Sequence, residues 1–315
     1  MRVTFLGTGT SLGVPIPGCD CEVCSSLDEK DKRLRTSCLL IFEEKNPKTN
    51  RPWQICIDAG PDFRYQMLRE NVKYLDAILL THEHRDHIAG LDDVRSYNYL
   101  QKSPMPVFGN KEALTGVRKM MYYAFENPIY PGLPEFELHE VSVNKQDNRL
   151  NIYNFLANYG AEIIEKETIK TNPVNNERQA LDNTVISDNG KTNPFNEIHF
   201  GNIKIVPVEV MHAKLPTLAY RIGKFAYITD AKTISEGEKT KLLGVKTLVV
   251  NALRRGEHFS HFTLDEALAL IDYVKPDRAF LTHMSHEMGP YKDFQKFLPE
   301  GVRLAYDTLK VDVEI

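Results

Sequence analysis

The chain has 315 residues, of which 42% are hydrophobic and 26% are charged, as is typical of globular proteins. This length supports one large domain or two small ones with a sizeable core. The 39 basic residues are outnumbered by 43 acidic ones, and the net charge of −4 disfavours a general nucleic-acid binder.

The chain begins with MRVTFLGTGTSLG, which predicts a short apolar strand followed by a glycine-rich turn. No long apolar run follows a charged start, as a secretory signal peptide would require. No apolar stretch approaches the roughly 20 residues that span a bilayer. We therefore expect a soluble, cytoplasmic protein with no membrane partner.

Short apolar runs rich in β-forming residues predict strands along the chain. In order, they are 2–7, 37–44, 53–60, 76–82, 203–210, 217–222, 224–230, 246–252 and 278–284. Helices are predicted between them, at 61–71, 91–100, 111–125, 235–244 and 263–274. The last helix begins with the Thr263–Glu266 spacing of a capping box. This order predicts sheets in the middle with helices on the outside.

Residues from 141 to about 200 differ from the rest because they are rich in Asn, Lys and Glu. We interpret the chain as a single domain, 1–315, that carries an inserted subdomain or flap in this segment. A disordered surface loop is the alternative interpretation of the same composition.

Three histidines and an aspartate lie close together in the segment LLTHEHRDHIAG. His82 and His84 are two residues apart, so in an extended or turning loop they can point to the same side and bind one metal ion. Asp86 and His87 follow and can face a neighbouring ion. Neutral imidazole suits Zn²⁺, Mn²⁺ or Fe²⁺, and carboxylate suits the harder of these ions. A solvated histidine-rich loop is the alternative.

Three further candidate ligands each follow an apolar, strand-like run. His212 follows IVPVEVM, Asp230 follows FAYIT and His283 follows RAFLT. Strand ends on one edge of a sheet often gather site residues that are distant in sequence. Each residue alone could be structural, but together with the histidine loop they predict a dinuclear metal site.

The chain contains five cysteines, an odd number that does not suggest a disulfide framework. Cys38 and Cys56 lie in apolar strand-like runs, so we expect them in the core. Cys19, Cys21 and Cys24 form a C-x-C-x-x-C motif, whose three thiolates require a fourth ligand for tetrahedral zinc.

Histidine is the best candidate for that fourth ligand. His139 and His199 flank the atypical segment and are expected at the surface, which leaves His258, His261 and His286 open. His286 follows His283 by three residues, so one of the two can serve the dinuclear site while the other reaches elsewhere.

The segments THEHRDH, MHAKLPTLAYRI, YITDAK and LTHMSH together resemble the hydrolase branch of the metallo-β-lactamase superfamily. The resemblance covers nearly the whole chain apart from 141–200. It implies an α/β (α+β) fold, an αββα four-layer sandwich of two mixed sheets with helices outside. A dinuclear site is then expected at one edge of the sheets.

The same resemblance implies a role for each candidate ligand. One metal is expected on His82, His84 and His212. The other is expected on Asp86, His87 and His283, with Asp230 bridging the two. The stretch ICIDAG matches the first motif of the family, so Asp58 is expected to orient the histidine loop without binding metal.

Two adjacent divalent cations make hydroxide available near neutral pH and stabilise charge on a phosphoryl or carbonyl oxygen. Asp86 can orient the nucleophile as a base. His261 lies just before a predicted helix start, where anions are favoured, and can donate a proton to a leaving oxygen. A surface histidine that caps the helix is the alternative for His261, and His258 is a second candidate for the acid.

The segments GTGTSLGVP and GCDCEVC, with the late LTHMSH, resemble more narrowly the PhnP group of phosphoribosyl cyclic phosphate phosphodiesterases. In that group three cysteines and the last histidine hold a structural zinc, which implies Cys19, Cys21, Cys24 and His286 here. The group also has its general-acid histidine at the position of His261. Because 141–200 has no clear counterpart, the resemblance defines the chemistry better than the substrate.

We therefore predict a dinuclear metal-dependent phosphodiesterase that uses metal-bound hydroxide on a small phosphodiester, with a cyclic ribose phosphate as one candidate. The predicted catalytic residues are Asp86 and His261. The predicted cofactors are two active-site divalent metals, Zn²⁺ or Mn²⁺, and one structural Zn²⁺. We expect a small-molecule substrate and no nucleic-acid partner, and we leave a homodimer open.

Three other classes of function share parts of this pattern. A tRNA 3′-processing nuclease has the same metal loop, but no long basic, Gly/Pro-rich arm for gripping tRNA is evident here. A periplasmic lactam hydrolase would need a signal peptide, and a glyoxalase-type thioester hydrolase would not need the cysteine site or His261. A non-catalytic, zinc-stabilised accessory protein is disfavoured because all seven expected ligands of the dinuclear site are present.

Overall fold

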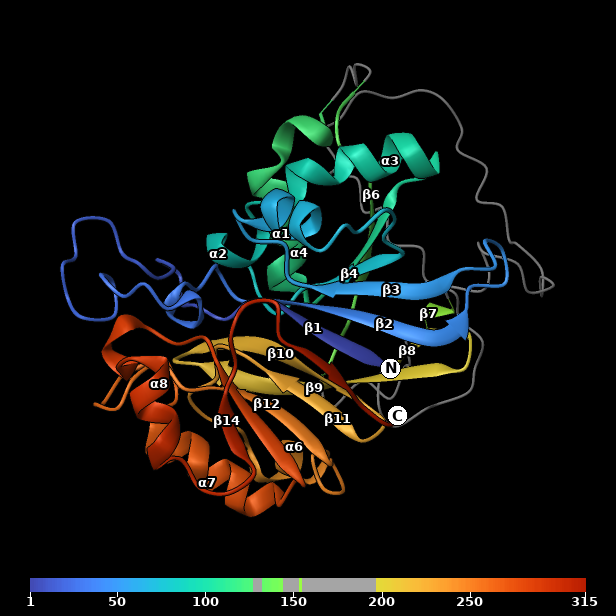
Figure 1. Cartoon of the computed structure of the whole chain (residues 1–315). Helices are drawn as coiled ribbons and strands as arrows, with labels where there is room; N and C mark the ends of the chain where they lie inside the picture. The colour runs from blue at the N-terminus through green and yellow to red at the C-terminus, as the bar shows by residue number, and fades with distance from the viewer. Residues whose placement is uncertain (127–131, 144–152, 155–196) are drawn as a thin grey trace, which may run out of the picture.

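In the computed structural model, two β-sheets pack face to face and helices cover their outer surfaces (Figure 1). The structure describes residues 1–126, 132–143, 153–154 and 197–315. Most of the atypical segment at 141–200, predicted to be a subdomain or flap, therefore lies outside the described residues.

The first sheet has seven strands among the described residues. In spatial order they are β15 (Lys310–Asp312), β1 (Arg2–Gly7), β2 (Ser37–Lys45), β3 (Pro52–Ile57), β4 (Ala77–Leu79), β5 (Met105–Gly109) and β6 (Phe136–Glu140). The sheet is antiparallel from β15 to β3 and parallel from β3 to β6.

The second sheet has eight strands within the same described ranges. In spatial order they are β14 (Val302–Leu304), β13 (Arg278–Thr282), β12 (Thr247–Asn251), β11 (Phe225–Ile228), β10 (Leu215–Ile222), β9 (Ile203–His212), β8 (Ile198–Phe200) and β7 (Tyr153–Asn154). Strands β11 to β14 are parallel, while β10 is antiparallel to both of its neighbours.

Helices lie on both outer faces. Those over the first sheet are α1 (Phe63–Arg69), α2 (Arg85–Ile88), α3 (Arg95–Gln101) and α4 (Lys111–Met120). Those over the second sheet are α6 (Glu236–Thr240), α7 (Leu264–Val274) and α8 (Tyr291–Phe294). Short 3₁₀ turns occur at η1 (Glu29–Asp31), η2 (Leu91–Val94), η3 (Tyr122–Ala124), η4 (His286–Met288) and η5 (Gln295–Phe297).

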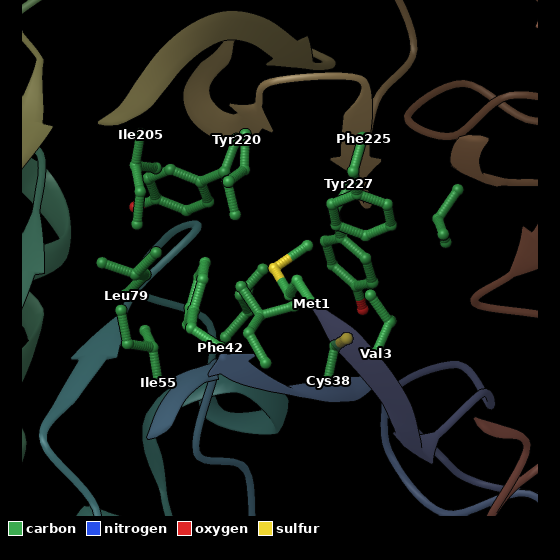
Figure 2. Packing of buried hydrophobic residues seen from close by; sticks show 14 of the residues in the cluster. Met1, Val3, Cys38, Phe42, Ile55, Leu79, Ile205, Tyr220, Phe225 and Tyr227 are labelled. Atoms are coloured by element: carbon green, nitrogen blue, oxygen red, sulfur yellow. The ribbon is translucent and has the colours of Figure 1, made fainter. Parts of the chain in front are cut away.

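The alternation of side chains along the strands explains the layers. In β2, Cys38, Leu40 and Phe42 point into the core between the sheets, while Leu39 packs under the helices of the first sheet. Figure 2 shows the core between the sheets, with residues of both sheets facing each other: Val3, Phe42, Ile55, Leu79, Ile205, Tyr220, Phe225 and Tyr227. Separate apolar clusters lie under each helical layer, and the predicted αββα sandwich is confirmed.

All nine predicted strands overlap observed strands, and the capping box of Thr263 and Glu266 is present at the start of α7. Six strands, β5, β6, β7, β8, β14 and β15, were not predicted because they are short or interrupted by charged residues and proline. Asp86 and His87 lie on the short helix α2, where the sequence predicted a loop.

Two predictions about single residues have different outcomes. Cys38 and Cys56 are fully buried, as predicted for core residues. The prediction of a surface position for His139 is wrong, because its ring stacks on Phe108 with centroids 4.5 Å apart and its side chain is only 13% exposed.

Within the described part of the chain, no helix combines the length and apolar character needed to cross a membrane.

Candidate dinuclear metal centre

The sheet topology brings the predicted ligands to one edge of the sandwich. Strand β9 ends at His212, while β11 and β13 end just before Asp230 and His283. Because β9 and β11 are both antiparallel to β10, and β11 to β13 are parallel, these three strand ends share an edge.

The histidine loop follows β4 of the other sheet and is tied to this edge by two contacts across the sandwich. The Tyr220 hydroxyl donates a hydrogen bond to the carbonyl of Leu80 (2.5 Å), and the Leu218 N–H donates to the carbonyl of Thr81 (2.9 Å). Both contacts lie directly before His82, so they place the loop against the strand ends of the second sheet.

Three acidic or imidazole residues at strand ends adopt left-handed backbone conformations. The φ angles are 63° at Asp58, 51° at Asp230 and 54° at His283. This region costs most residues roughly 1–2 kcal/mol, although Asp, Asn and His adopt it more readily than others. Each residue lies one or two positions after the end of its strand, at the shared edge.

Among the described residues, the candidate ligand atoms fall into groups of three whose atoms all lie within 4.8 Å of one another, and two of these groups share no residue. The first group is His82, His84 and His212; the second is Asp86, His87 and His283. These are the two groups implied by the family resemblance in the sequence.

Asp230 lies between the two groups. One of its oxygens is 3.2 Å from His283 Nε2 and the other is 3.3 Å from His87 Nε2. Asp230 also belongs to a group with His82 and to another with His212. A carboxylate in this position can contact an ion on either side.

Contacts on the far side of each ring orient the imidazoles. His87 donates through Nδ1 to Asp58 (2.7 Å), and His212 donates through Nδ1 to the carbonyl of Ser260 (2.8 Å). His82 Nδ1 lies 3.0 Å from the Thr81 hydroxyl. These contacts leave Nε2 of each ring facing the cluster, the arrangement that metal-binding histidines usually have.

The donor set fits divalent metal ions. Nε2 of His82, His87 and His283 is buried and has no hydrogen-bond partner among the described residues. A buried polar atom without a partner is costly, and several converging on one point are expected where an ion completes the site. The fold also implies divalent metals.

The pKa directions agree with this interpretation. Burial lowers the pKa of His82 well below its usual value and lowers the pKa of His212 to about 4, so both rings are neutral at pH 7. Burial also opposes protonation of His87, but Asp230, Asp86 and Asp58 together raise its pKa well above the usual range. Carboxylates that hold a proton this tightly also attract a cation, which would displace that proton.

The site is open to solvent at His84, Asp86 and His261. His82, His87, His283 and Asp230 are almost fully buried, whereas His84 is exposed. The side chains of Asp86 and His261 are 13% and 12% exposed to solvent. Substrate can therefore reach the cluster past these residues.

His261 lies at this opening, two residues before Thr263, which caps α7. Its Nε2 is 3.0 Å from Asp230, and its Nδ1 faces the Ser260 hydroxyl (3.0 Å) and His258 Nδ1 (3.2 Å). Burial lowers the pKa of His261, and the contact with Asp230 opposes that lowering. His258, the alternative acid, is one ring further from the cluster.

The three cysteines of the N-terminal loop gather around a single histidine. Nδ1 of His286 lies 3.3, 3.3 and 3.6 Å from the sulfur atoms of Cys19, Cys21 and Cys24. The N–H of Cys24 donates to Cys21 Sγ, and this contact chiefly lowers the pKa of the Cys21 thiol to about 6. One imidazole and three thiols in this arrangement suit zinc.

The two candidate metal sites are joined by four consecutive residues, because His283 belongs to one and His286 to the other. Between them, the N–H of Met284 donates to the carbonyl of Thr8, and the carbonyl of Met284 accepts from the N–H of Thr10. The cysteine site thus holds the N-terminal loop against the segment that carries His283.

Thr81 and Ser260 were not identified from the sequence. Thr81 is fully buried and donates to Asp58 through both its N–H and its hydroxyl. The carbonyl of Ser260 orients His212. The only clue in the sequence was that each residue directly precedes a predicted site residue: Thr81 precedes His82, and Ser260 precedes His261.

Comparisons with known proteins agree with this geometry. A model of the beta-lactamase superfamily domain matches residues 54–155 and 156–284. A solved structure, the crystal structure of a new diphosphatase from the PhnP family, is 30% identical with a TM-score of 0.75. The alignment covers 100% of this chain and 98% of that one.

Two curated relatives are similar over almost the whole chain. A ribonuclease Z from Listeria monocytogenes serotype 4a (strain HCC23) is 25% identical over 336 residues, which cover 98% of this chain and 97% of that protein. An octanoyltransferase from Porphyromonas gingivalis is 32% identical over 315 residues, which cover 100% of this chain and 52% of that protein. The chain therefore spans about half the length of the second relative.

Proposed function

Since the chain belongs to the beta-lactamase superfamily, we propose that it is a dinuclear metal-dependent phosphodiesterase acting on a small phosphodiester, with cyclic ribose phosphates as candidate substrates. The chain is a hydrolase of the metallo-β-lactamase fold, related to a PhnP-family diphosphatase and to ribonuclease Z. The diphosphatase and the ribonuclease are both named for cleaving bonds to phosphorus, which supports this chemistry.

The position of Asp230 is the observation that carries the proposal. It contacts His87 and His283 of one ligand group, lies with His82 and His212 of the other, and is 3.0 Å from His261. A bridging carboxylate beside a partly exposed imidazole supports a dinuclear centre with an adjacent proton donor.

The ligand types suggest which ions are bound. Three imidazoles in one group, and two imidazoles with a carboxylate in the other, suit Zn²⁺ or Mn²⁺. The Cys19, Cys21, Cys24 and His286 set suits a structural Zn²⁺. When bound, the two active-site cations lower the pKa of a water molecule and stabilise charge on a phosphoryl oxygen.

The residues at the opening then have distinct tasks. Asp86 orients the attacking water and accepts its proton. The water oxygen forms a bond to phosphorus while the bond from phosphorus to the leaving oxygen breaks. His261 donates the proton that the leaving oxygen needs, a contribution worth typically 10²–10⁴-fold in rate.

The test compares wild type with His261→Ala, both loaded with Mn²⁺, on two phosphodiesters. Bis(p-nitrophenyl) phosphate has a good leaving group and needs little protonation, whereas a ribose cyclic phosphate releases an alkoxide. We expect His261→Ala to lower kcat/KM on the cyclic phosphate by about 10²–10⁴-fold and to lower it far less on the aryl ester.

His199→Ala is the control, because His199 lies on β8 and pairs with Glu197 (3.3 Å) outside the ligand groups. It should leave both activities unchanged. Equal losses of His261→Ala on the two esters would remove His261 from the acid role. Absence of any phosphodiester turnover by wild type at full metal loading would overturn the proposed function.

Ribonuclease Z activity is the second candidate, because that relative matches the chain at nearly full length on both sides. The same metal and proton chemistry would then act on a tRNA precursor. A gel shift and a cleavage assay with precursor tRNA separate the two candidates. Tight binding that falls steeply with salt, followed by cleavage, would favour the nuclease.

A further inference from the structure

An exposed phenylalanine lies beside the proposed proton donor. The loop between β12 and α7 carries His258, Phe259, Ser260 and His261. Phe259 is 79% exposed, while Ser260 is 4% exposed. Among the described residues, Phe259 is the only exposed large apolar side chain within two positions of Asp86 or His261.

This loop is held against the site by contacts that directly follow Phe259. The carbonyl of Ser260 accepts a hydrogen bond from His212 (2.8 Å), and the N–H of Ser260 donates to His258 Nδ1 (3.3 Å). Two residues further on, the N–H of Phe262 donates to the carbonyl of Ala231 (2.6 Å). The backbone of Phe259 is therefore positioned, and its ring is the part left in solvent.

A row of rings connects Phe259 to the cluster. The Phe259 and His258 centroids are 4.9 Å apart with planes inclined by 31°, and the His258 and His261 centroids are 5.0 Å apart. His261 in turn contacts Asp230 at 3.0 Å. The aromatic side chain is thus separated from the proton donor by a single imidazole.

The position of His261 defines which part of a substrate this row would meet. In the proposed reaction His261 protonates the leaving oxygen, so the group attached to that oxygen lies on the side of His261 and Phe259. An exposed aromatic face stacks well on planar rings, and such stacking tolerates many ring types.

Resting on the proposed function, we propose that Phe259 binds a planar ring carried by the leaving alcohol of the substrate. Water adds its oxygen to phosphorus, the bond from phosphorus to the alcohol oxygen breaks, and His261 supplies the proton that makes the free alcohol. Phe259 holds the ring of that alcohol during the reaction. It therefore selects among substrates without taking part in bond breaking.

The test uses two methyl diesters that differ only in a ring, adenosine 5′-methyl phosphate and ribose 5′-methyl phosphate. Wild type should release adenosine and methyl phosphate from the first. Phe259→Ala should lower kcat/KM on the adenosine ester about tenfold and leave the ribose ester within about twofold. Phe259→Trp, which keeps an aromatic face, should retain activity on the adenosine ester.

Phe297→Ala is a matched control, because Phe297 is 80% exposed and lies on η5, outside the site. It should change neither rate. Equal effects of Phe259→Ala on the two esters, or release of AMP and methanol by wild type, would overturn the inference while leaving the phosphodiesterase intact. If metal-loaded wild type hydrolysed bis(p-nitrophenyl) phosphate but neither methyl ester, this inference alone would fall; if it hydrolysed no phosphodiester at all, the proposed function would fall as well.

Discussion

Asp58→Asn should weaken metal binding without touching a ligand. The Asp58 carboxylate is fully buried and accepts three hydrogen bonds, from the N–H of Thr81 (2.8 Å), the hydroxyl of Thr81 (2.9 Å) and Nδ1 of His87 (2.7 Å). Asparagine has nearly the same shape. Its amide oxygen can keep the bond to the Thr81 N–H, while its NH₂ group replaces the oxygen that faces His87.

That NH₂ group reverses the hydrogen bond to the ring. In wild type, His87 donates through Nδ1 to a carboxylate, which leaves the Nε2 lone pair free to face the cluster. In Asp58→Asn, the amide would donate to Nδ1, which moves the ring proton to Nε2 and blocks that lone pair. Metal binding would then be weakened by the free energy needed to restore the other tautomer.

The expected size follows from the loss of this one contact. Changing the partner of a metal-binding histidine typically weakens metal affinity 10–100-fold, or about 1.4–2.7 kcal/mol. The loss should fall on the ion held by Asp86, His87 and His283. The three-histidine group keeps its contacts with Thr81 and Ser260.

Competition titration of metal-stripped protein with a chelator and Mn²⁺ measures this effect. One of the two active-site dissociation constants should rise 10–100-fold in Asp58→Asn. Asp76→Asn is the control, since Asp76 is also buried and accepts a backbone N–H, from Gln54 (2.8 Å), but touches no ligand. Wild-type affinity for both ions in a folded Asp58→Asn would refute the reasoning.

Three further predictions concern stability and metal content. Burial raises the pKa of Asp76 from 3.8 to about 6, so stability from this group is complete below pH 3.8 and is lost as the pH rises through 6. Urea unfolding should therefore show Asp76→Asn gaining about 2 kcal/mol on wild type between pH 4 and 7, and a constant difference would contradict this. Cys21→Ser should lose one zinc per chain by elemental analysis and several kcal/mol of stability, while the other two metals remain; joint loss of all three would count against separate sites. Tyr220→Phe leaves the buried carbonyl of Leu80 without its 2.5 Å partner and should lower the free energy of unfolding by about 1–3 kcal/mol, so wild-type stability in urea would show that this contact is unimportant.

Much of the fold could be predicted because apolar periodicity is a local property. The long strands β1, β2, β9 and β10 each carry runs of β-forming residues. The start of α7 is marked in the sequence by the capping-box residues Thr263 and Glu266. Strands such as β14, with three residues, gain their stability from pairing with a neighbour. Such pairing leaves little trace in the local sequence.

His139 shows how tertiary packing overrides a local interpretation. It lies beside a polar, atypical segment, which suggested solvent. The parallel pairing of β5 with β6 places His139 opposite Phe108, and the two rings stack. A single sequence contains no information on which residue a strand will face across a sheet.

The sequence alone was sufficient to identify the candidate ligands. The close spacing of metal-capable side chains, and their positions after apolar runs, are local features of the sequence. The family resemblance already implied His286 for the cysteine site and His261 for the acid, but only the tertiary structure decided which nitrogen of each ring faces its partners and that His261 Nε2 contacts Asp230. These choices depend on distances between strand ends far apart in sequence, and only the packing of the two sheets sets those distances.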